Sequence, residues 1–498
     1  MLFASMSFLW IFLPAVLVVN LLLSNVRNEE LRYILKNTWL LIASLVFYAW
    51  GGIYYVFIML ASIAVNYAAG RLLEKKRKKS ILIMTIILNL ATLFVFKYFN
   101  MCVVLVENIY AACVGNIGFR QALKDMLLMN GTGALKIKEI VLPIGISFFT
   151  FQAMSYVIDV YTKKAPVQKN IFKFALYVTF FPQLIAGPIV KYSDVARQID
   201  GRKESVPLFV SGQRRFICGL AKKVLLANTF AVTADAVWGI KPETMGSMTA
   251  WLGAFAYTMQ IYYDFSGYSD MAIGLGRMFG FRFKENFAYP YTSLSIQEFW
   301  RRWHISLSSW FKEYVYFPLG GNRNGKLKTY RNVFIVFLLT GIWHGADFTF
   351  LIWGLMYAFF QIIERLFLGR LLGKNLIKPL NWVYTMLIVV LGWVLFRSDN
   401  IVYARQYIGA MFGKYNGSVA GYNIYQCLGF LSMELILAFI SGLIGIGFVS
   451  RSLRGVYDRI RKKEWFMVID MLLMLVLLAI CVLRIISGTY NPFIYFKF

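Results

Sequence analysis

The chain has 498 residues, of which 59% are hydrophobic and 15% are charged, and its formal net charge is +28. Apolar runs recur along its whole length, as at residues 81–96, 333–343 and 471–482. These runs exclude an ordinary soluble domain and argue against a β-barrel, whose strands alternate in polarity. Basic residues cluster in short loops between the runs, which is the positive-inside pattern and argues against nucleic acid as a partner. We therefore expect an all-α polytopic protein of the lipid bilayer, with one integral domain over residues 1–498.

The N-terminal part is predicted to cross the membrane several times. Residues 8–23 have neither the basic start nor the cleavage site of a signal peptide, so they form a retained first span. Residues 39–69 form a hairpin broken at Gly51-Gly52, and the basic cluster at residues 71–79 fixes its cytoplasmic end. The N-terminus is therefore expected outside the cytoplasm. Residues 81–99 and 140–160 leave and re-enter, and residues 102–118 receive no assignment.

The middle of the chain carries one interrupted and one amphipathic segment. Residues 174–190 are apolar but contain Pro182, Gly187 and Pro188, which favours a re-entrant element buried in protein. Residues 224–240 and 251–276 form an out-and-back pair. Residues 277–331 hold aromatic side chains that alternate with Arg and Lys, which predicts a cytoplasmic region lying at the membrane interface.

The C-terminal part is predicted to end outside the cytoplasm. Residues 333–363 form a hairpin or two short helices, residues 380–396 cross outward, residues 427–449 return, and residues 466–486 form the last span. The tail at residues 487–498 is then extracytoplasmic. No internal repeat is present, which argues against an inverted-repeat transporter.

The two histidines both lie between residues 297 and 345. His344 lies roughly 20 Å along a helix beyond Arg331, which places a titratable ring inside the membrane. An imidazole suits general-base catalysis near neutral pH, and Trp343 would form a wall beside it. The alternative is a histidine hydrogen-bonded between packed helices. Asp347 either orients the ring or caps a helix end.

His304 follows two arginines and a tryptophan at the expected inner boundary. We expect its ring to line the inner mouth of a pathway, where Arg301 and Arg302 hold the phosphates of a nucleotide-type donor and Trp303 contacts it. The alternative is an interfacial aromatic anchor.

Two carboxylates, Asp264 and Asp270, lie in an apolar run and are candidates for substrate binding or an ion pathway. They could equally fix helix packing through buried hydrogen bonds. The five cysteines are scattered without metal-ligand spacing, so no metal site is expected.

Three long motifs identify a family. They are Gln297-Glu-Phe-Trp-Arg-Arg-Trp-His-Ile-Ser-Leu-Ser-Ser-Trp310, Tyr316-Phe-Pro-Leu-Gly-Gly-Asn-Arg323 and Thr340-Gly-Ile-Trp-His-Gly345. They resemble the membrane-bound O-acyltransferase family, in particular its bacterial alginate O-acetyltransferase branch. The resemblance implies a ring of about ten or more transmembrane helices, with re-entrant elements, around a central tunnel. It also implies that His344 is essential, and the position of His304 recurs in this branch.

The resemblance further implies an O-acetyltransferase of the bacterial inner membrane. Its donor would be a cytoplasmic thioester, preferably acetyl-CoA, with no bound cofactor. Its acceptor would be an extracellular polysaccharide, reached with a secreted or membrane-anchored SGNH-type partner protein. The alternatives are D-alanyl transfer to teichoic acid from a carrier-protein thioester, and a transporter that relays protons through His344 and Asp264.

The aromatic tail carries the most specific hypothesis. A phenol is a plausible nucleophile only beside a base, and His344 reached from the outside would be that base. We therefore expect Tyr495 to act as a transient acyl carrier. The alternative is an aromatic belt that anchors the last helix.

Overall fold

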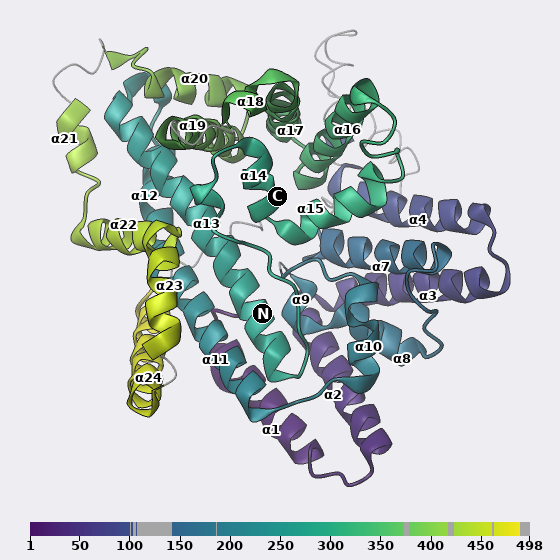
Figure 1. The fold of residues 1–498 in the computed structure, drawn as a ribbon. Coiled ribbons are helices and arrows are strands. Elements are labelled where there is room, and N and C mark those ends of the chain that lie inside the picture. Colours follow the sequence, from purple (N-terminus) through teal and green to yellow (C-terminus); the bar gives the residue numbers. More distant parts are fainter. Residues whose placement is uncertain are drawn as a thin grey trace, which may run out of the picture.

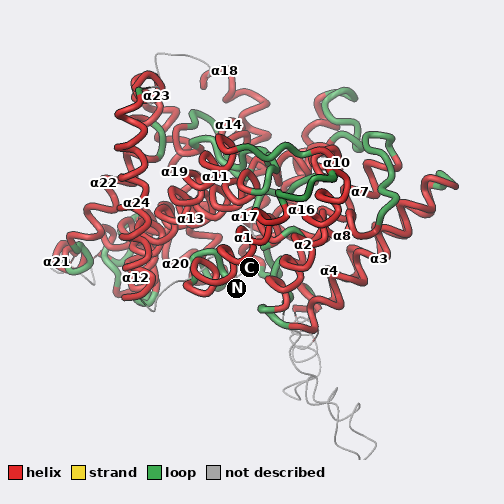
Figure 2. The backbone as a smooth tube through the Cα atoms, turned by 90° about the horizontal axis from the view of Figure 1, so that it is seen from below, coloured by secondary structure: helices red, strands yellow, loops and turns green. Residues whose placement is uncertain are grey.

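The computed structural model describes residues 1–99, 101–102, 106, 142–185, 187–372, 378–416, 423–460 and 463–488. Every regular element within these ranges is helical (Figure 1), so the predicted all-α class is confirmed. Tyr495 and nearly all of the segment at residues 102–118 lie outside the described residues. Figures 1 and 2 place α21 to α24 on one side of the molecule and α3 and α4 on the other.

Six segments in the described part of the chain are long and apolar enough to cross a membrane. They are Ile53–Lys75 (α3), Lys79–Lys97 (α4), Val206–Trp238, Phe348–Leu368, Lys378–Arg397 (α19) and Trp465–Ser487. The last lies within α24 (Glu464–Ser487), where Leu472, Leu473 and Leu475 are each more than half exposed. Exposed leucines on a long apolar helix are typical of a helix surface that contacts lipid. The chain is a multi-pass membrane protein.

The N-terminal helices confirm the predicted hairpin. A short π-helix precedes α1 (Leu13–Leu23), and α2 (Glu29–Ala49) begins where the Asn28 side chain accepts a hydrogen bond from the Leu31 amide. Such a cap satisfies an amide that the first helical turn leaves free. Gly52, at φ +143°, makes the turn into α3, because side-chain-bearing residues rarely adopt that backbone conformation.

The interrupted segment is indeed broken, and it is buried. It consists of α8 (Ile171–Thr179) and α9 (Phe181–Leu184), which are separated by one residue just before Pro182. All four residues of α9 are buried. The flanking helices are α7 (Ile146–Tyr161) and α10 (Tyr192–Gly201). The proline ends one helix and begins the next, as its missing amide requires.

The longest α-helix in the described part of the chain, α13 (Ser247–Met278), packs along α11 (Val206–Ala221). Glycines allow this close contact, because a Cβ on Gly219 would lie 2.6 Å from the Gly267 carbonyl oxygen. A π-helix, η2 (Lys222–Ala227), joins α11 to α12 (Asn228–Trp238). The predicted span at residues 224–240 therefore begins earlier, at Val206.

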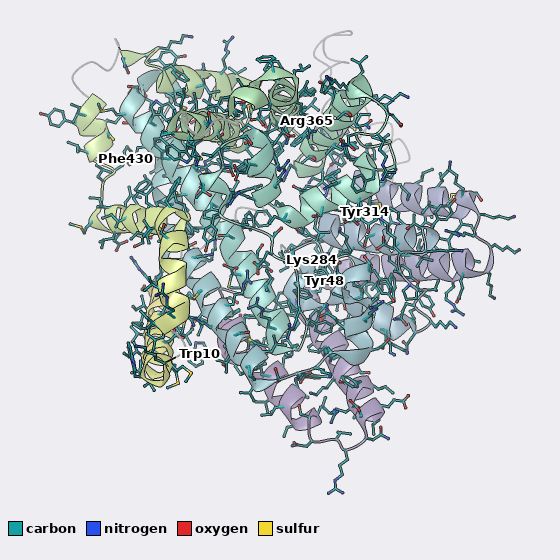
Figure 3. All side chains as sticks on the ribbon, viewed as in Figure 1. Trp10, Tyr48, Lys284, Tyr314, Arg365 and Phe430 are labelled. Atoms are coloured by element: carbon teal, nitrogen blue, oxygen red, sulfur yellow. The ribbon has the colours of Figure 1, made fainter. Side chains whose placement is uncertain are left out.

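The region expected at the membrane interface is a set of short helices that dock on the core. It contains α14 (Ile296–Arg302), α15 (Ile305–Phe311) and the π-helix η5 (Lys312–Tyr316). Trp300, Trp303 and Trp310 are all buried. Tyr314, labelled in Figure 3, donates a hydrogen bond to Asp159 on α7 at 2.9 Å. These aromatic side chains pack against protein, whereas the placement of residues 277–331 at the membrane interface stays a prediction.

The predicted hairpin at residues 333–363 is confirmed as α16 (Lys326–His344) and α17 (Phe348–Ile363). The predicted span at residues 427–449 is wrong. The chain there forms α22 (Met433–Gly445), whose 13 residues cover roughly 20 Å, less than the hydrocarbon core. The remaining helices are η6 (Glu364–Leu368), α18 (Gly369–Leu372), α20 (Ile401–Met411), α21 (Asn423–Leu428) and α23 (Phe448–Ile460), with 3₁₀ turns η3 (Pro242–Thr244) and η4 (Pro290–Thr292).

Candidate active site

The α16–α17 hairpin positions His344 at the last residue of α16. The two helices touch through glycine, because a Cβ on Gly341 would lie 2.5 Å from the Phe350 carbonyl oxygen and 3.3 Å from the Gly354 Cα. A Cβ on Gly345 would collide with the Phe350 ring. The glycines around the histidine therefore serve close backbone packing.

Aromatic rings surround the His344 side chain, which is buried. Its ring centroid lies 4.9 Å from that of Trp343, 4.9 Å from that of Trp353 and 5.1 Å from that of Phe396, all at steep angles. The ring makes no hydrogen bond with a described residue. Asp347 does not orient it, because the Asp347 carboxylate caps α17 by accepting a hydrogen bond from the Thr349 amide at 3.0 Å. The helix-cap alternative for Asp347 is therefore confirmed.

His304 is fixed by a hydrogen-bond network. Its Nδ1 lies 3.2 Å from the Asn286 side-chain oxygen, which also accepts hydrogen bonds from the Ser306 amide and hydroxyl. The Asn286 amide nitrogen donates to the Ser269 hydroxyl at 3.0 Å, which orients its oxygen toward the imidazole. An oxygen acceptor at Nδ1 places the proton there and leaves the lone pair on Nε2. Nε2 is buried and has no partner among the described residues.

The backbone at His304 is strained, with φ at +44°. A residue other than glycine in this left-handed conformation costs free energy and is often held at functional sites. Its ring packs edge-on against Phe265 of α13 at 4.7 Å. His304 is only 1% exposed, so it is not the interfacial anchor that the sequence left open.

Trp343 brings the two histidines together. The centroid of the His304 imidazole lies 6.2 Å from that of the Trp343 ring, and the centroid of the His344 imidazole lies 4.9 Å from it. The same indole lines an apolar cavity of about 570 Å³, together with Phe151, Trp310 and Leu339. The only two histidines of the chain, 40 residues apart, thus flank one aromatic side chain beside a cavity.

Of the two arginines predicted to bind the donor, only Arg302 lies at an open cleft, which has a volume of about 800 Å³. Arg302 lines this cleft with Lys378 and Trp382, and it pairs with Glu298 at 2.6 Å. Arg301 is exposed and makes no ion pair with a described residue. Trp303 is not at the cleft. It is buried in the core, with its ring 4.8 Å from Trp393.

Cations hold the two carboxylates of α13. Asp264 lies 2.7 Å from the Lys223 ammonium, and Asp270 pairs with Lys222 at 2.6 Å and with Arg215 at 2.7 Å. These pairs tie α13 to α11 and η2. Neither carboxylate contacts a histidine in the part of the chain that the structure describes. The arrangement favours the packing role over substrate binding.

A second, polar cavity of about 470 Å³ lies at the C-terminal end of α19. Asp235, Asp347, Arg397 and Asp399 line it, together with Phe396, whose ring also contacts His344. The cleft with Arg302 lies at the opposite end of α19, near Lys378. The histidine site is therefore closer to the polar cavity than to the cleft.

Sequence reasoning missed several residues of this site. Asn286 lies outside the three motifs and reaches His304 only through the fold, whereas Ser306 lies within the first motif but carries no signal of a contact with His304. Trp353 and Phe396 lie in predicted apolar segments, where an aromatic residue is not unusual. Among the described residues, no group of three or more His, Cys, Asp or Glu side chains comes together as metal ligands.

Comparison with known proteins decides the family. The model of MBOAT, the membrane-bound O-acyltransferase family, matches residues 42–397. The chain belongs to this family. It is 39% identical to a probable alginate O-acetylase AlgI of Pseudomonas putida, over 100% of both chains. It is 34% identical to a peptidoglycan O-acetyltransferase of Helicobacter pylori, over 83% of this chain and 80% of the relative.

A more distant relative is a teichoic acid D-alanyltransferase of Bacillus subtilis, 27% identical over 43% of this chain and 57% of the relative. The predicted membrane-bound O-acyltransferase identity is confirmed, and the protein is an O-acyltransferase. The residues 42–397 that match the family include both histidines, Trp343 and the ion pairs of α13.

Proposed function

We propose that this protein moves an acetyl group from cytoplasmic acetyl-CoA across the bacterial inner membrane for O-acetylation of an extracellular polysaccharide. The similarity to alginate and peptidoglycan O-acetylating enzymes supports acetyl transfer to a polysaccharide. The observation that carries the proposal is the convergence of the only two histidines on Trp343 beside a cavity. A transporter driven by a histidine–carboxylate relay gains no support, because Asp264 is paired with Lys223.

His344 acts as the general base. It takes the proton from an acceptor hydroxyl as that oxygen attacks the thioester carbonyl. The carbon–sulfur bond then breaks, and the thiolate receives the proton, so the products are an acetyl ester and free CoA thiol. His304, with Nε2 unpaired, is the second proton acceptor of the site. The aromatic rings around His344 exclude water, which would otherwise hydrolyse the thioester.

The two ends of α19 suggest the path. Acetyl-CoA would place its phosphates in the cleft with Arg302 and Lys378, and Arg301 would contact it at the rim. Trp382 and Phe396 lie 14 residues apart on α19, roughly 21 Å along the helix. A flexible pantetheine arm suits such a distance. The proposed tunnel, inside a ring of transmembrane helices, connects the cleft past His344 to the polar cavity.

Tyr495 is proposed as the transient carrier of the acetyl group. It lies outside the described residues, so this step rests on the sequence and the family resemblance. Its phenol would attack the thioester, lose its proton to His344 and present the ester to a secreted SGNH-type partner. Mass spectrometry of the C-terminal peptide should find an acetyl ester that hydroxylamine removes. A Tyr495→Phe variant that acetylates polymer at the normal rate would exclude the relay.

Donor identity and topology have separate tests. D-alanyl transfer from a carrier protein is the alternative, and a neighbouring D-alanine ligase gene would favour it, whereas a neighbouring SGNH-type protein would favour acetylation. The positive-inside pattern predicts that both termini lie outside the cytoplasm. To check that orientation, a cysteine is introduced at each terminus of the protein, and intact cells are labelled with a membrane-impermeant maleimide.

The main experiment measures the release of CoA thiol from acetyl-CoA by the purified protein in proteoliposomes. His344→Ala should lower the rate by about 10²–10⁴-fold, the usual effect of losing a positioned base. Its melting temperature in detergent should match that of the wild type. A normally folded His344→Ala protein with the wild-type rate would contradict the proposal.

A further inference from the structure

Two consecutive side chains at the end of α4 hold the last turn of α16. The Lys97 ammonium donates hydrogen bonds to the carbonyl oxygens of Trp343 and His344, the latter at 2.9 Å. The Tyr98 hydroxyl donates to the Ile342 carbonyl oxygen at 2.5 Å. A helix leaves its last four carbonyl groups without partners, and here another helix supplies donors to three of them in sequence.

The last turn depends on these donors because α16 itself ends loosely. The Gly345 amide reaches the Gly341 carbonyl oxygen only at 3.5 Å, and the backbone at Gly345 is extended. The His344 ring makes no hydrogen bond with a described residue. Its place is therefore set by the aromatic rings around it and by the backbone that Lys97 holds.

Lys97 has no other evident purpose in the described part of the chain. It makes no ion pair there, and its ammonium lies 5.7 Å from the centroid of the Trp343 ring. A cation at the C-terminus of a helix interacts favourably with the helix dipole. An ionised side chain inside the bilayer costs free energy, so a lysine within a candidate membrane span indicates a function.

We propose that Lys97 is a positioning residue for His344, with Tyr98 as its helper. The ammonium fixes the Trp343 and His344 carbonyl groups, and thereby holds the imidazole in line with the reacting hydroxyl. The inference rests on the proposed function, in which His344 is the base. Lys97 acts through the backbone and does not touch the substrate.

The kinetic test uses Lys97→Met, which keeps the length of the side chain and removes its donors. The kcat should fall by about 10²-fold at unchanged KM for acetyl-CoA, since a displacement of about 1 Å costs that much. Lys97→Arg, which restores a cation with several donors, should recover most of the rate. Lys79→Met, at the exposed opposite end of α4, is the matched control and should behave as the wild type.

A spectroscopic test reads the position of the ring without activity. Because the chain has two histidines, ¹⁵N-histidine labelling gives ring-nitrogen signals from two imidazoles, and His344→Ala assigns them. Lys97→Met should shift or broaden the His344 signal and leave that of His304 unchanged. If Lys97→Met does not insert stably, Tyr98→Phe removes one of the three bonds and should give the same change with a smaller loss of kcat.

Failure of this inference differs from failure of the proposed function. An inactive His344→Ala protein beside a fully active Lys97→Met protein overturns only the role of Lys97. A raised KM at normal kcat in Lys97→Met also overturns it, because Lys97 would then bind the donor. Wild-type activity in His344→Ala overturns the proposed function itself.

Discussion

The interface of α13 with α11 and η2, and the end of the α16–α17 hairpin, both bury polar side chains, but they satisfy them differently. At the first, Asp264 and Asp270 each meet cationic partners within 2.7 Å. At the second, His304 Nε2 has no partner among the described residues, and the His344 ring makes no hydrogen bond there. Paired charges hold helices in place, whereas unpaired imidazole nitrogens remain available for proton transfer. The difference assigns a structural role to the ion pairs of α13 and a catalytic role to the two histidines.

The largest expected effect breaks the scaffold side of this comparison. Lys223→Met leaves the Asp264 carboxylate, which is 1% exposed, without its cation. Removing one partner of a buried pair costs about 3–5 kcal/mol of stability. The melting temperature in detergent should therefore fall sharply. Adding Asp264→Asn should recover much of the loss, and a single variant as stable as the wild type would refute the pairing.

The next prediction sharpens the chemistry side. His304→Asn keeps a side chain that tolerates the left-handed backbone but removes the free ring nitrogen. The kcat should fall by about 10²-fold, or about 2.7 kcal/mol. The melting temperature should stay close to the wild-type value. Unchanged kcat would remove His304 from the site.

A smaller effect is expected from the hairpin itself. Gly341→Ala places a Cβ 2.5 Å from the Phe350 carbonyl oxygen, which forces α16 and α17 apart at a cost of about 1–3 kcal/mol. Thermal unfolding measures the loss. Gly201→Ala, where no atom lies within 4 Å of the added Cβ, is the control and should unfold normally. Equal stability of the two variants would show that the hairpin can relax.

The smallest effect concerns the donor cleft. Replacing both Arg301 and Arg302 with alanine should raise KM for acetyl-CoA by about fivefold with little change in kcat, because exposed ion pairs contribute about 1 kcal/mol or less. Lys169→Ala removes another exposed cation and should leave KM unchanged. An unchanged KM in the double variant would move phosphate binding to other residues, such as Lys378.

Much of the fold follows from the sequence, since apolar runs and glycine breaks located the hairpins and Pro182 located the interruption. The sequence does not show whether an aromatic side chain such as Trp300 or Trp310 contacts lipid or protein. These buried residues were therefore assigned to the membrane interface. Ser432 splits the predicted span at residues 427–449 by capping α22, a local bond that hydropathy does not detect.

The candidate site was predictable only in part. His344 stood out as a titratable group in an apolar run. Lys97 lies at the end of an apolar run, which marks it as unusual, but its contact with the site joins residues 247 positions apart and leaves no local pattern. The contact of Asn286 with His304, 18 positions away, leaves none either. The role of Asp264 was left open, and its ion pair with Lys223 depends on how η2 turns toward α13.

The most direct test compares His344→Ala with Lys223→Met, with each rate of CoA release divided by the amount of folded protein. We expect His344→Ala to melt like the wild type yet lose about 10²–10⁴-fold in rate per folded molecule. Lys223→Met should melt at a lower temperature and keep the wild-type rate per folded molecule. Two results would contradict this account: a His344→Ala protein that releases CoA at the wild-type rate, or a Lys223→Met protein that is as stable as the wild type but releases CoA more slowly. Either would show that catalytic and structural roles are not divided between these two regions.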